Sequence, residues 1–366
     1  MTATEISPTG SAAPEPARPI DLWPRRIRLL PGPRGSRLII DTRIVVTSLI
    51  LIAVLVGFGL YALTLGETEL SVADVWAALT GTAETGTRRI VLDWRLPRIV
   101  IAVLGGAALG ISGAIFQSMT RNPLGSPDII GFNTGAYTGA LLVSLVFTSS
   151  AMSVTAGALV GGLLTAVLVY ALAFKGGLLG FRLIVVGIAI SAMLNALNAW
   201  ILVGANSESA VSATVWGQGS LNGVRWPDVM PVLWSLVILL PICLYLVRRL
   251  DLLELGDDFG RMLGLSPERT RLALLALGVG LISIITAIVG PITFVALAAP
   301  QIARRLVDAS GPQLVPSALV AGVLLLVSDV IAQRIIAPSQ LPVGIVTACL
   351  GGVYLIWIMS RARKRV

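Results

Sequence analysis

Residues 44–65 read IVVTSLILIAVLVGFGLYALTL and contain no charged side chain. A helix of this length rises about 33 Å at about 1.5 Å per residue, which matches the hydrocarbon core of a bilayer. Because lipid offers the backbone no hydrogen-bond partners, an apolar run of this length crosses the membrane as a helix. The stretch therefore predicts an α-helical membrane protein.

The same pattern recurs along the 366 residues, and the loops between the runs are too short for a separate fold. Apolar residues make up 55% of the chain and charged residues 13%, a composition typical of membrane proteins. Pro291 and Pro300 interrupt the eighth run, so we expect a broken or partly re-entrant helix there. The fold class is therefore all-α, a polytopic transmembrane domain at 44–366 with about ten helices. The predicted spans are 44–65, 97–118, 131–148, 153–174, 183–203, 229–248, 270–289, 292–309, 315–336 and 341–360.

Residues 1–43 are rich in proline and arginine and show little apolar periodicity, so we expect a largely disordered tail. With this tail in the cytoplasm and ten spans alternating, 21 of the 27 lysines and arginines fall on the cytoplasmic side. This bias predicts a multi-pass protein of the cytoplasmic membrane with both termini inside. The net charge of +8 is spread over the ends of the spans, which does not indicate nucleic-acid binding.

Several kinds of catalytic site have no counterpart in the sequence. No G-x-x-x-x-G-K-[ST] phosphate loop occurs, so we expect no ATP hydrolysis by this chain. Histidine is absent, and Cys243 and Cys349 both lie in apolar runs, so we expect neither a metal site nor a disulfide framework. The sequence therefore predicts a chain without enzymatic activity or a cofactor of its own.

Polar side chains inside the predicted spans are candidates for function, because each needs a partner or a water-lined path within the bilayer. Gln117 lies near the end of the second span, and Asn195 and Asn198 share one face of the fifth. Hydrogen bonding between helices and lining of a translocation pathway are both consistent with the asparagines. For Asp329 in the ninth span, we expect a local ion pair with Arg334.

The loop at 249–269 combines apolar residues with glycines and charges. Gly256 and Gly264 predict short helices lying at the cytoplasmic surface. Phe259 and Leu263 would give such a helix an apolar face surrounded by charges. Both an interfacial helix and a docking surface for a partner are consistent with this pattern.

From about residue 50 to residue 360 the sequence resembles the permease subunits of the vitamin B12 and iron-siderophore ABC importers. That family has ten spans per subunit and both termini in the cytoplasm, in agreement with the pattern of apolar runs and charges. The motifs that carry the resemblance are RLPR at 95–98, GISGAIFQ at 110–117, RNPL at 121–124, LG at 255–256 and 263–264, GPITF at 290–294 and LPVGIVT at 341–347.

The resemblance implies a set of partners. They are a second permease subunit, two copies of an ATPase subunit that carry ATP and Mg, an extracytoplasmic binding protein, and the surrounding lipid. The cytoplasmic loop would dock on the ATPase, with the contacts implied at Leu255, Gly256, Phe259, Leu263 and Gly264. Outer arginines of the family meet carboxylates of the binding protein, which implies this role for Arg95 and Arg98. The family's third arginine falls on Gln333, and Arg334 follows it directly.

Departures from the common family pattern indicate the subtype. Gln301 follows Pro300 where many members have histidine, and the segment at 351–354 lacks the usual proline. In these features the chain is similar to the second permease of ferric-enterobactin-type importers. That similarity implies a heterodimer with a paralogue and a ferric siderophore as substrate, with the iron kept in its chelator. The alternatives are a haem or cobalamin importer permease, or a secondary transporter that works alone.

Overall fold

The structure is a computed structural model that describes residues 27–31, 37–66, 68–147, 151–174, 180–309 and 311–362. The chain divides into two compact units, residues 1–46 and residues 47–366. In the first unit, strands β1 (Ile27–Pro31) and β2 (Arg37–Asp41) pair antiparallel. Ile and Leu runs on both sides of a Gly/Pro-rich stretch allow these ten residues of the predicted tail to pair as strands. Residues 1–26 and 32–36 of the predicted tail lie outside the described residues.

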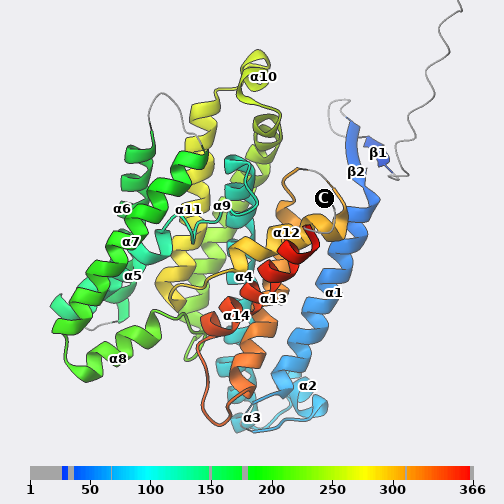
Figure 1. Ribbon diagram of the computed structural model, residues 1–366. Helices are drawn as coiled ribbons and strands as arrows, with labels where there is room; N and C mark the ends of the chain where they lie inside the picture. Colours follow the sequence, from blue (N-terminus) through cyan, green and yellow to red (C-terminus); the bar gives the residue numbers. More distant parts are fainter. Residues whose placement is uncertain are drawn as a thin grey trace, which may run out of the picture. The chain divides into compact units, whose positions relative to one another are not determined.

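The second unit is helical, and the predicted all-α fold is confirmed (Figure 1). Each predicted span corresponds to one helix. These helices are α1 (Thr42–Thr64), α4 (Leu96–Thr120), α5 (Phe132–Leu142), α6 (Ala151–Ala173), α7 (Gly180–Gly204), α9 (Trp226–Glu254), α11 (Pro267–Val289), α12 (Val295–Val307), α13 (Leu314–Arg334) and α14 (Val343–Ala362). Seven helices in the described parts of the chain are long and apolar enough to cross a membrane, whereas α5, α12 and α14 are shorter or less apolar.

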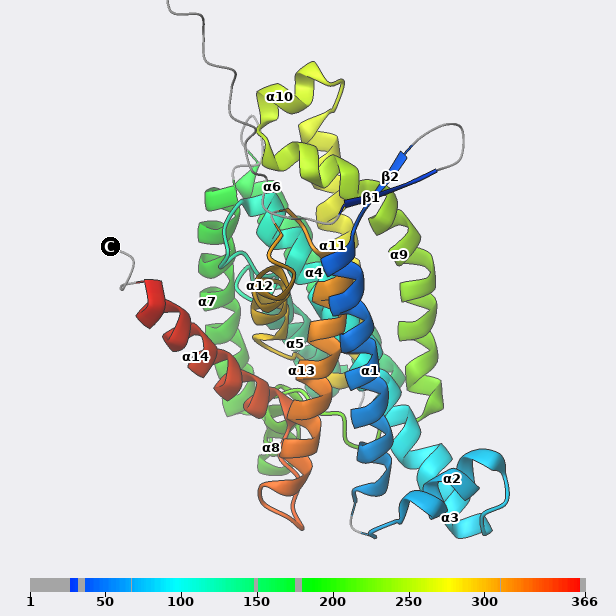
Figure 2. The same cartoon turned by 90° about the vertical axis from the view of Figure 1, so that its right-hand side faces the viewer.

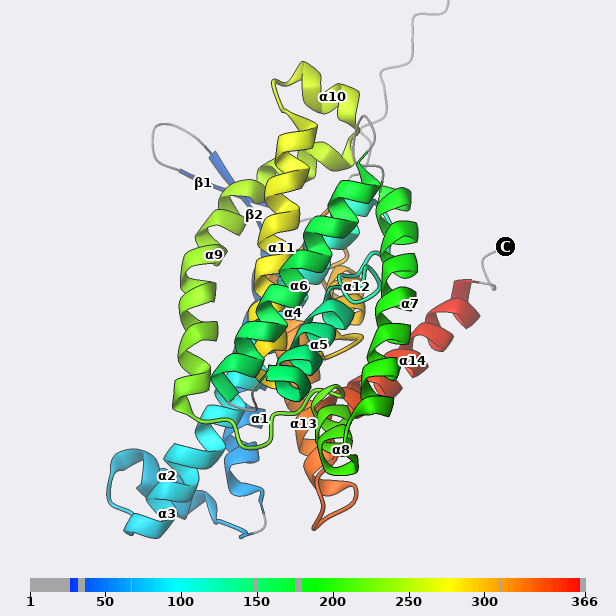
Figure 3. The same cartoon turned by 90° about the vertical axis from the view of Figure 1, so that its left-hand side faces the viewer.

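Short elements connect these helices. Between α1 and α4 lie α2 (Val72–Thr80), α3 (Thr85–Arg89) and the π-helical segment η2 (Ile90–Arg95). A second π-helical segment, η3 (Val143–Phe147), extends α5, and α8 (Ser207–Trp216) follows α7. Helix α10 (Asp257–Met262) lies between α9 and α11. Within the second unit, α10 lies at one end of the bundle and α2, α3 and α8 at the other (Figures 1, 2 and 3). We refer to these as the α10 end and the α2 end.

Helix α4 is the centre of the bundle and packs against α9, α11, α12 and α13. Its glycines make this packing possible: a β-carbon on Gly106 or Gly110 would overlap the backbone of α13. In the same way, Gly139 of α5 lies against Gly157 of α6. Small residues let helices approach closely where lipid gives no hydrophobic drive for association.

The interruption of the eighth span predicted at Pro291 is present, whereas α12 continues through Pro300. Residues 290–294 are largely non-helical, and α12 starts only at Val295 and has 13 residues. Phe294 adopts a positive φ of 66° and Gly290 one of 77°, so the chain turns sharply at both ends of this segment. The broken segment places backbone groups inside the bundle, where they need polar partners.

Candidate functional site

The α10 end carries a loop that two glycines define. Helix α9 ends at Glu254, and Gly256 follows with a φ of 119°. Helix α10 ends at Met262, and Gly264 follows with a φ of 78°. Both values lie in the region that favours glycine, so these residues allow the chain to turn into and out of α10. The predicted short helix between the two glycines is confirmed.

Large apolar side chains are exposed around α10. Met262 is 83% exposed, and the others are Leu255, Phe259 and Leu263. Charged side chains accompany them, including Asp258, which pairs with Arg261 at 3.2 Å. An apolar patch with a charged rim at the end of a bundle is typical of a surface that docks into a partner's groove.

Asp257 fixes the start of α10 to the bundle. Its carboxylate accepts two hydrogen bonds from Arg271 of α11, at 2.6 and 2.7 Å, and one from Arg121 at 3.0 Å. Arg121 stands directly after α4 and also donates to the carbonyl of Leu253 at the end of α9. The hydrogen bonds from Arg271 are the main cause that lowers the pKa of Asp257 below its ordinary value. We call Asp257, Arg121 and Arg271 the Asp257 cluster.

A cleft of about 580 Å³ lies beside this cluster. It is lined by the end of α4, the start of α7 and the residues from Leu255 to Phe259. The sequence motifs include Arg121 but gave no reason to select Asp257 or Arg271. Only the fold brings these three residues together, since they come from three different segments.

At the opposite end of α4, Arg98 binds Asp329 of α13. The guanidinium donates to both carboxylate oxygens at 2.9 to 3.2 Å, and the Asp329 side chain is only 2% exposed. Gln333 donates to the same carboxylate at 2.8 Å, and Gln340 accepts from Arg98 at 2.9 Å. We call these four residues the Asp329 cluster.

The expected local pair of Asp329 with Arg334 is therefore wrong. Five residues along a helix correspond to a rotation of about 140° beyond one turn, so the two side chains leave α13 on different faces. Gln333, four residues after Asp329, does lie on the same face and binds it. The ionic partner comes from α4 instead.

The three arginines predicted to dock the binding protein have different environments. Arg95 donates to the backbone carbonyls of Leu63 and Thr68. Arg98 is mostly buried in the Asp329 cluster, whereas Arg334 is exposed. Two of the three guanidiniums thus have partners within the chain.

The polar residues predicted inside the spans also differ. Gln117 is buried, donates to the carbonyl of Leu297 at 2.8 Å and accepts from Arg304, so it joins α4 to α12. Asn195 is exposed on α7. Asn198 is buried, and neither its Nδ2 nor its Oδ1 has a hydrogen-bond partner among the described residues. The spacing of the two asparagines thus does not give them a common environment.

A polar network at the broken segment was missed by the sequence analysis. Asp128, in the loop before α5, accepts a hydrogen bond from Asn133 at 2.7 Å and one from the backbone N–H of Phe294 at 3.2 Å. Asn133 in turn accepts from Thr286 of α11 at 2.9 Å. The signal was available: helix-breaking Pro127 and Pro291 lie within the two irregular segments that meet here. The network supplies polar partners where regular helix is interrupted.

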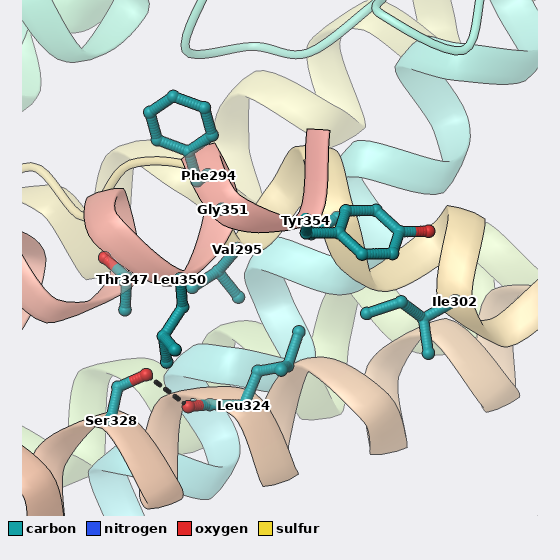
Figure 4. A pocket seen from close by; sticks show the side chains of 10 residues that line it. Phe294, Val295, Ile302, Leu324, Ser328, Thr347, Leu350, Gly351 and Tyr354 are labelled. Atoms are coloured by element: carbon teal, nitrogen blue, oxygen red, sulfur yellow. Dashed lines mark hydrogen bonds between the residues drawn. The ribbon is translucent and has the colours of Figure 1, made fainter. Parts of the chain in front are cut away.

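The hollow in Figure 4 lies between α12, α13 and α14 and has a volume of only about 40 Å³. Its lining is mostly apolar, and the Ser328 hydroxyl is directed at the carbonyl of Leu324, 2.7 Å away (Figure 4). Pockets for small organic ligands usually measure about 300–1,000 Å³. This hollow is therefore too small for a metal chelate. No group of three or more histidine, cysteine, aspartate or glutamate side chains that could hold a metal occurs among the described residues.

Comparisons with known proteins agree with this architecture. The FecCD transport family matches residues 50–361. The chain is 44% identical over 326 residues to the ferric enterobactin transport system permease protein FepG of Escherichia coli (strain K12), covering 89% of this chain and 99% of that protein. It is 32% identical over 338 residues to the hemin transport system permease protein HmuU of Yersinia pestis, covering 89% and 98%.

A solved structure of a metal-chelate type ABC transporter in an inward-facing conformation has the same fold. The TM-score is 0.77 at 26% identity, and the match covers 86% of this chain and 98% of that one. The family match and the FepG similarity both extend over most of the helical unit. The chain belongs to the FecCD transport family.

Proposed function

We propose that this chain is the permease subunit of an ATP-driven importer that moves a ferric siderophore across the cytoplasmic membrane by alternating access. The observation that carries the proposal is the exposed apolar patch on α10, held between two glycine turns in a member of a transport family. The sequence contains no phosphate loop, so the energy source would be a partner chain that docks at this patch.

The ATPase-docking surface is formed by Leu255, Gly256, Phe259, Leu263 and Gly264. Burying three large apolar side chains in a groove favours binding by about 1.5–3 kcal/mol each. The two glycines allow the short helix to change its angle against the bundle. ATP and Mg would bind on the partner ATPase chains, and closure of these chains would move α10.

The α10 end faces the cytoplasm in this proposal, as do both termini. Arg121, Arg261 and Arg271 at this end follow the positive-inside rule. The binding protein would approach the α2 end, where Arg334 is exposed and Arg95 and Arg98 lie near it. Surface pairs of this kind contribute about 0–1 kcal/mol each, so they set register and encounter rate.

The translocation pathway would lie between two permease subunits. The hollow within the bundle is too small for a chelate, and Asn195 is exposed on α7. A second subunit that faces α7 would enclose a path lined by the exposed Asn195, with the buried Asn198 on the same helix. Of the three expected pathway residues, Gln117 instead joins α4 to α12. The similarity to FepG supports a paralogous partner and hence a heterodimer.

The substrate class follows from the relatives. The greater identity to a ferric enterobactin permease than to a hemin permease favours a ferric siderophore. In this proposal the substrate is the intact chelate, in which the chelator keeps the iron.

Uptake by the reconstituted complex tests the proposal. Proteoliposomes that contain both permease subunits and the ATPase should accumulate ⁵⁵Fe-siderophore only with binding protein outside and ATP inside. Accumulation of haem or cobalamin but no siderophore would overturn the substrate. Transport by this chain alone, driven by an ion gradient, would overturn the ABC mechanism.

A further inference from the structure

The segment between α1 and α4 has an apolar face that the bundle does not cover. Val75 and Ala78 of α2 are buried against Leu63 of α1 and Val91 of η2. Val72, Trp76 and Leu79 lie on the adjacent face and are exposed, Trp76 by 68%. At positions i, i+4 and i+7, these three side chains form a single stripe along the helix.

The stripe extends the buried apolar side of α2 onto its exposed side. Asp74 lies on the other side of the helix, where its carboxylate accepts hydrogen bonds from Ser71 and completes a capping box. Helix α2 is thus amphipathic, with an apolar arc only partly used for packing. Leaving a Val-Trp-Leu stripe in water is unfavourable, because apolar surface gains free energy when it is removed from water.

The position of α2 indicates what covers the stripe. Figures 2 and 3 show α2 and α3 projecting sideways from the end of the helical bundle, beside the lower ends of α1 and α9. The exposed face of α1 is itself apolar and includes Leu49, Ile52, Val56 and Leu60. Helix α2 packs against the end of α1 at Leu63, so the stripe lies next to a helix whose length and apolar composition suit a membrane span.

Tryptophans mark the same level of the molecule. Of the seven tryptophans in the described residues, Trp76, Trp94 and Trp216 belong to α2, η2 and α8, and Trp226 donates to the carbonyl of Leu92 in η2. Trp76, Trp94, Trp200 and Trp234 are each more than half exposed. Tryptophan collects at membrane interfaces, because its ring is apolar and its N–H reaches the headgroups. The α2 end thus carries an aromatic belt, and Trp76 belongs to it.

We propose that α2 lies in the headgroup layer of the bilayer, with the Val72–Trp76–Leu79 stripe inserted at the boundary of the acyl chains. The exposed Arg88 and Arg89 of α3 are then able to donate to lipid phosphates. The helix holds the start of α4 at a fixed depth, because η2 connects α2 and α3 directly to it. This inference does not depend on the cargo of the transporter.

Fluorescence quenching in the assembled complex tests the position of Trp76. The complex is reconstituted in phospholipid brominated either near the headgroup or near the end of the acyl chain. The difference between the wild type and Trp76→Phe isolates the emission of Trp76. We expect about twofold quenching by the shallow bromines and less by the deep ones. The control is Trp216→Phe, because Trp216 stacks on Tyr137 with ring centroids 6.3 Å apart. Its emission should respond less to either lipid.

A second measurement does not depend on tryptophan. Nitroxide labels are placed at Leu79→Cys on the stripe and, as the matched control, at Ala73→Cys on another exposed face, both in a Cys349→Ser background. The label at position 79 should collide more with oxygen, which enters lipid, and the label at 73 more with a water-soluble nickel chelate. Equal access of both labels to nickel, or no quenching of Trp76, would overturn the proposal. So would quenching in the complex that disappears when the binding protein is added, because a protein would then cover the stripe.

Discussion

The Asp257 cluster and the Asp329 cluster hold the two ends of the same helix. Arg98 lies in the first turn of α4 and binds Asp329, whereas Arg121 follows the last turn and binds Asp257. The chemistry is the same, but the surroundings differ: the Asp329 side chain is 2% exposed and that of Asp257 is 31% exposed. The exposure of the carboxylate therefore decides how strongly an Arg–Asp pair holds the end of a helix in place.

Energetics support this distinction. Removing one partner of a buried pair leaves an uncompensated charge and costs about 3–5 kcal/mol. A pair at the surface contributes about 0–1 kcal/mol, because water replaces the lost partner. The Asp329 cluster is therefore expected to fix α4 to α13 more strongly than the Asp257 cluster fixes α10. In the Asp257 cluster only Arg271 is buried, and Asp257 and Arg121 line a cleft of about 580 Å³.

The largest expected effect is at the Asp329 cluster. Asp329→Ala leaves the Arg98 guanidinium buried with Gln340 as its one remaining side-chain partner among the described residues, so we expect a loss of about 3–5 kcal/mol in the free energy of unfolding. Thermal or denaturant unfolding of the purified protein in detergent measures it. The double variant Arg98→Met with Asp329→Leu should recover most of the loss, because neither charge then remains. A loss below about 1 kcal/mol for the single variant would show that Arg98 reaches water.

A substitution in the Asp257 cluster should affect the nearby loop more than the rest of the protein. In Asp257→Asn, two arginines lose their shared anion, and hydrogen bonds to charged groups contribute about 1.5–3 kcal/mol. We expect at least about tenfold faster amide exchange in residues 255–266, with a smaller change in global stability than for Asp329→Ala. Hydrogen–deuterium exchange with mass spectrometry measures both. Asp258→Asn is the matched control, since the Asp258–Arg261 pair is exposed. Equal exchange rates in Asp257→Asn and Asp258→Asn would contradict the hypothesis that the Asp257 cluster holds the loop.

The pH dependence of the same exchange gives a smaller and more selective test. Hydrogen bonds from Arg271 lower the pKa of Asp257, so the folded protein favours the charged form of this carboxylate. Its contribution is then complete above the ordinary pKa of 3.8 and is lost only as the pH falls through the lowered value. After correction for intrinsic exchange, protection of α10 should stay constant from neutral pH down to about pH 4. A loss of protection between pH 7 and pH 5 would mean that another group controls the loop.

The sequence predicts the spans well and the contacts between them poorly, for a physical reason. Apolar length is a local property, so α1 and α11 can be identified from about 20 residues each. The Asp329 cluster joins residues 231 positions apart, and the i to i+5 spacing of Asp329 and Arg334 suggested a nearer partner. The arginine motif identified Arg98 as important, but only the packing of α4 on α13 shows that its partner lies within the chain.

The candidate docking surface was more accessible to sequence reasoning. Gly256 and Gly264 are needed where φ is positive, and both turns follow from residue type. Asp257 and Asp258 are adjacent and chemically identical, so nothing local indicates which of them holds the loop. Arg121 and Arg271 decide it through the approach of α4 and α11.

The smallest expected effect is at Arg334, which sharpens the comparison because it lies five residues after Asp329 but on another face of α13. The side chain is exposed, so Arg334→Glu should change the free energy of unfolding by less than about 1 kcal/mol. If carboxylates of the binding protein meet this arginine, the substitution replaces attraction by repulsion. Binding-protein-stimulated ATPase activity of the complex should then fall a few fold at low salt and recover partly at high salt, because screening weakens both signs of interaction. Arg248→Glu, an exposed position of α9 outside the α10 loop, serves as the charge-matched control for the salt dependence. An unchanged stimulation in Arg334→Glu would leave docking to Arg95 and Arg98, whose partners within the chain would first have to be displaced.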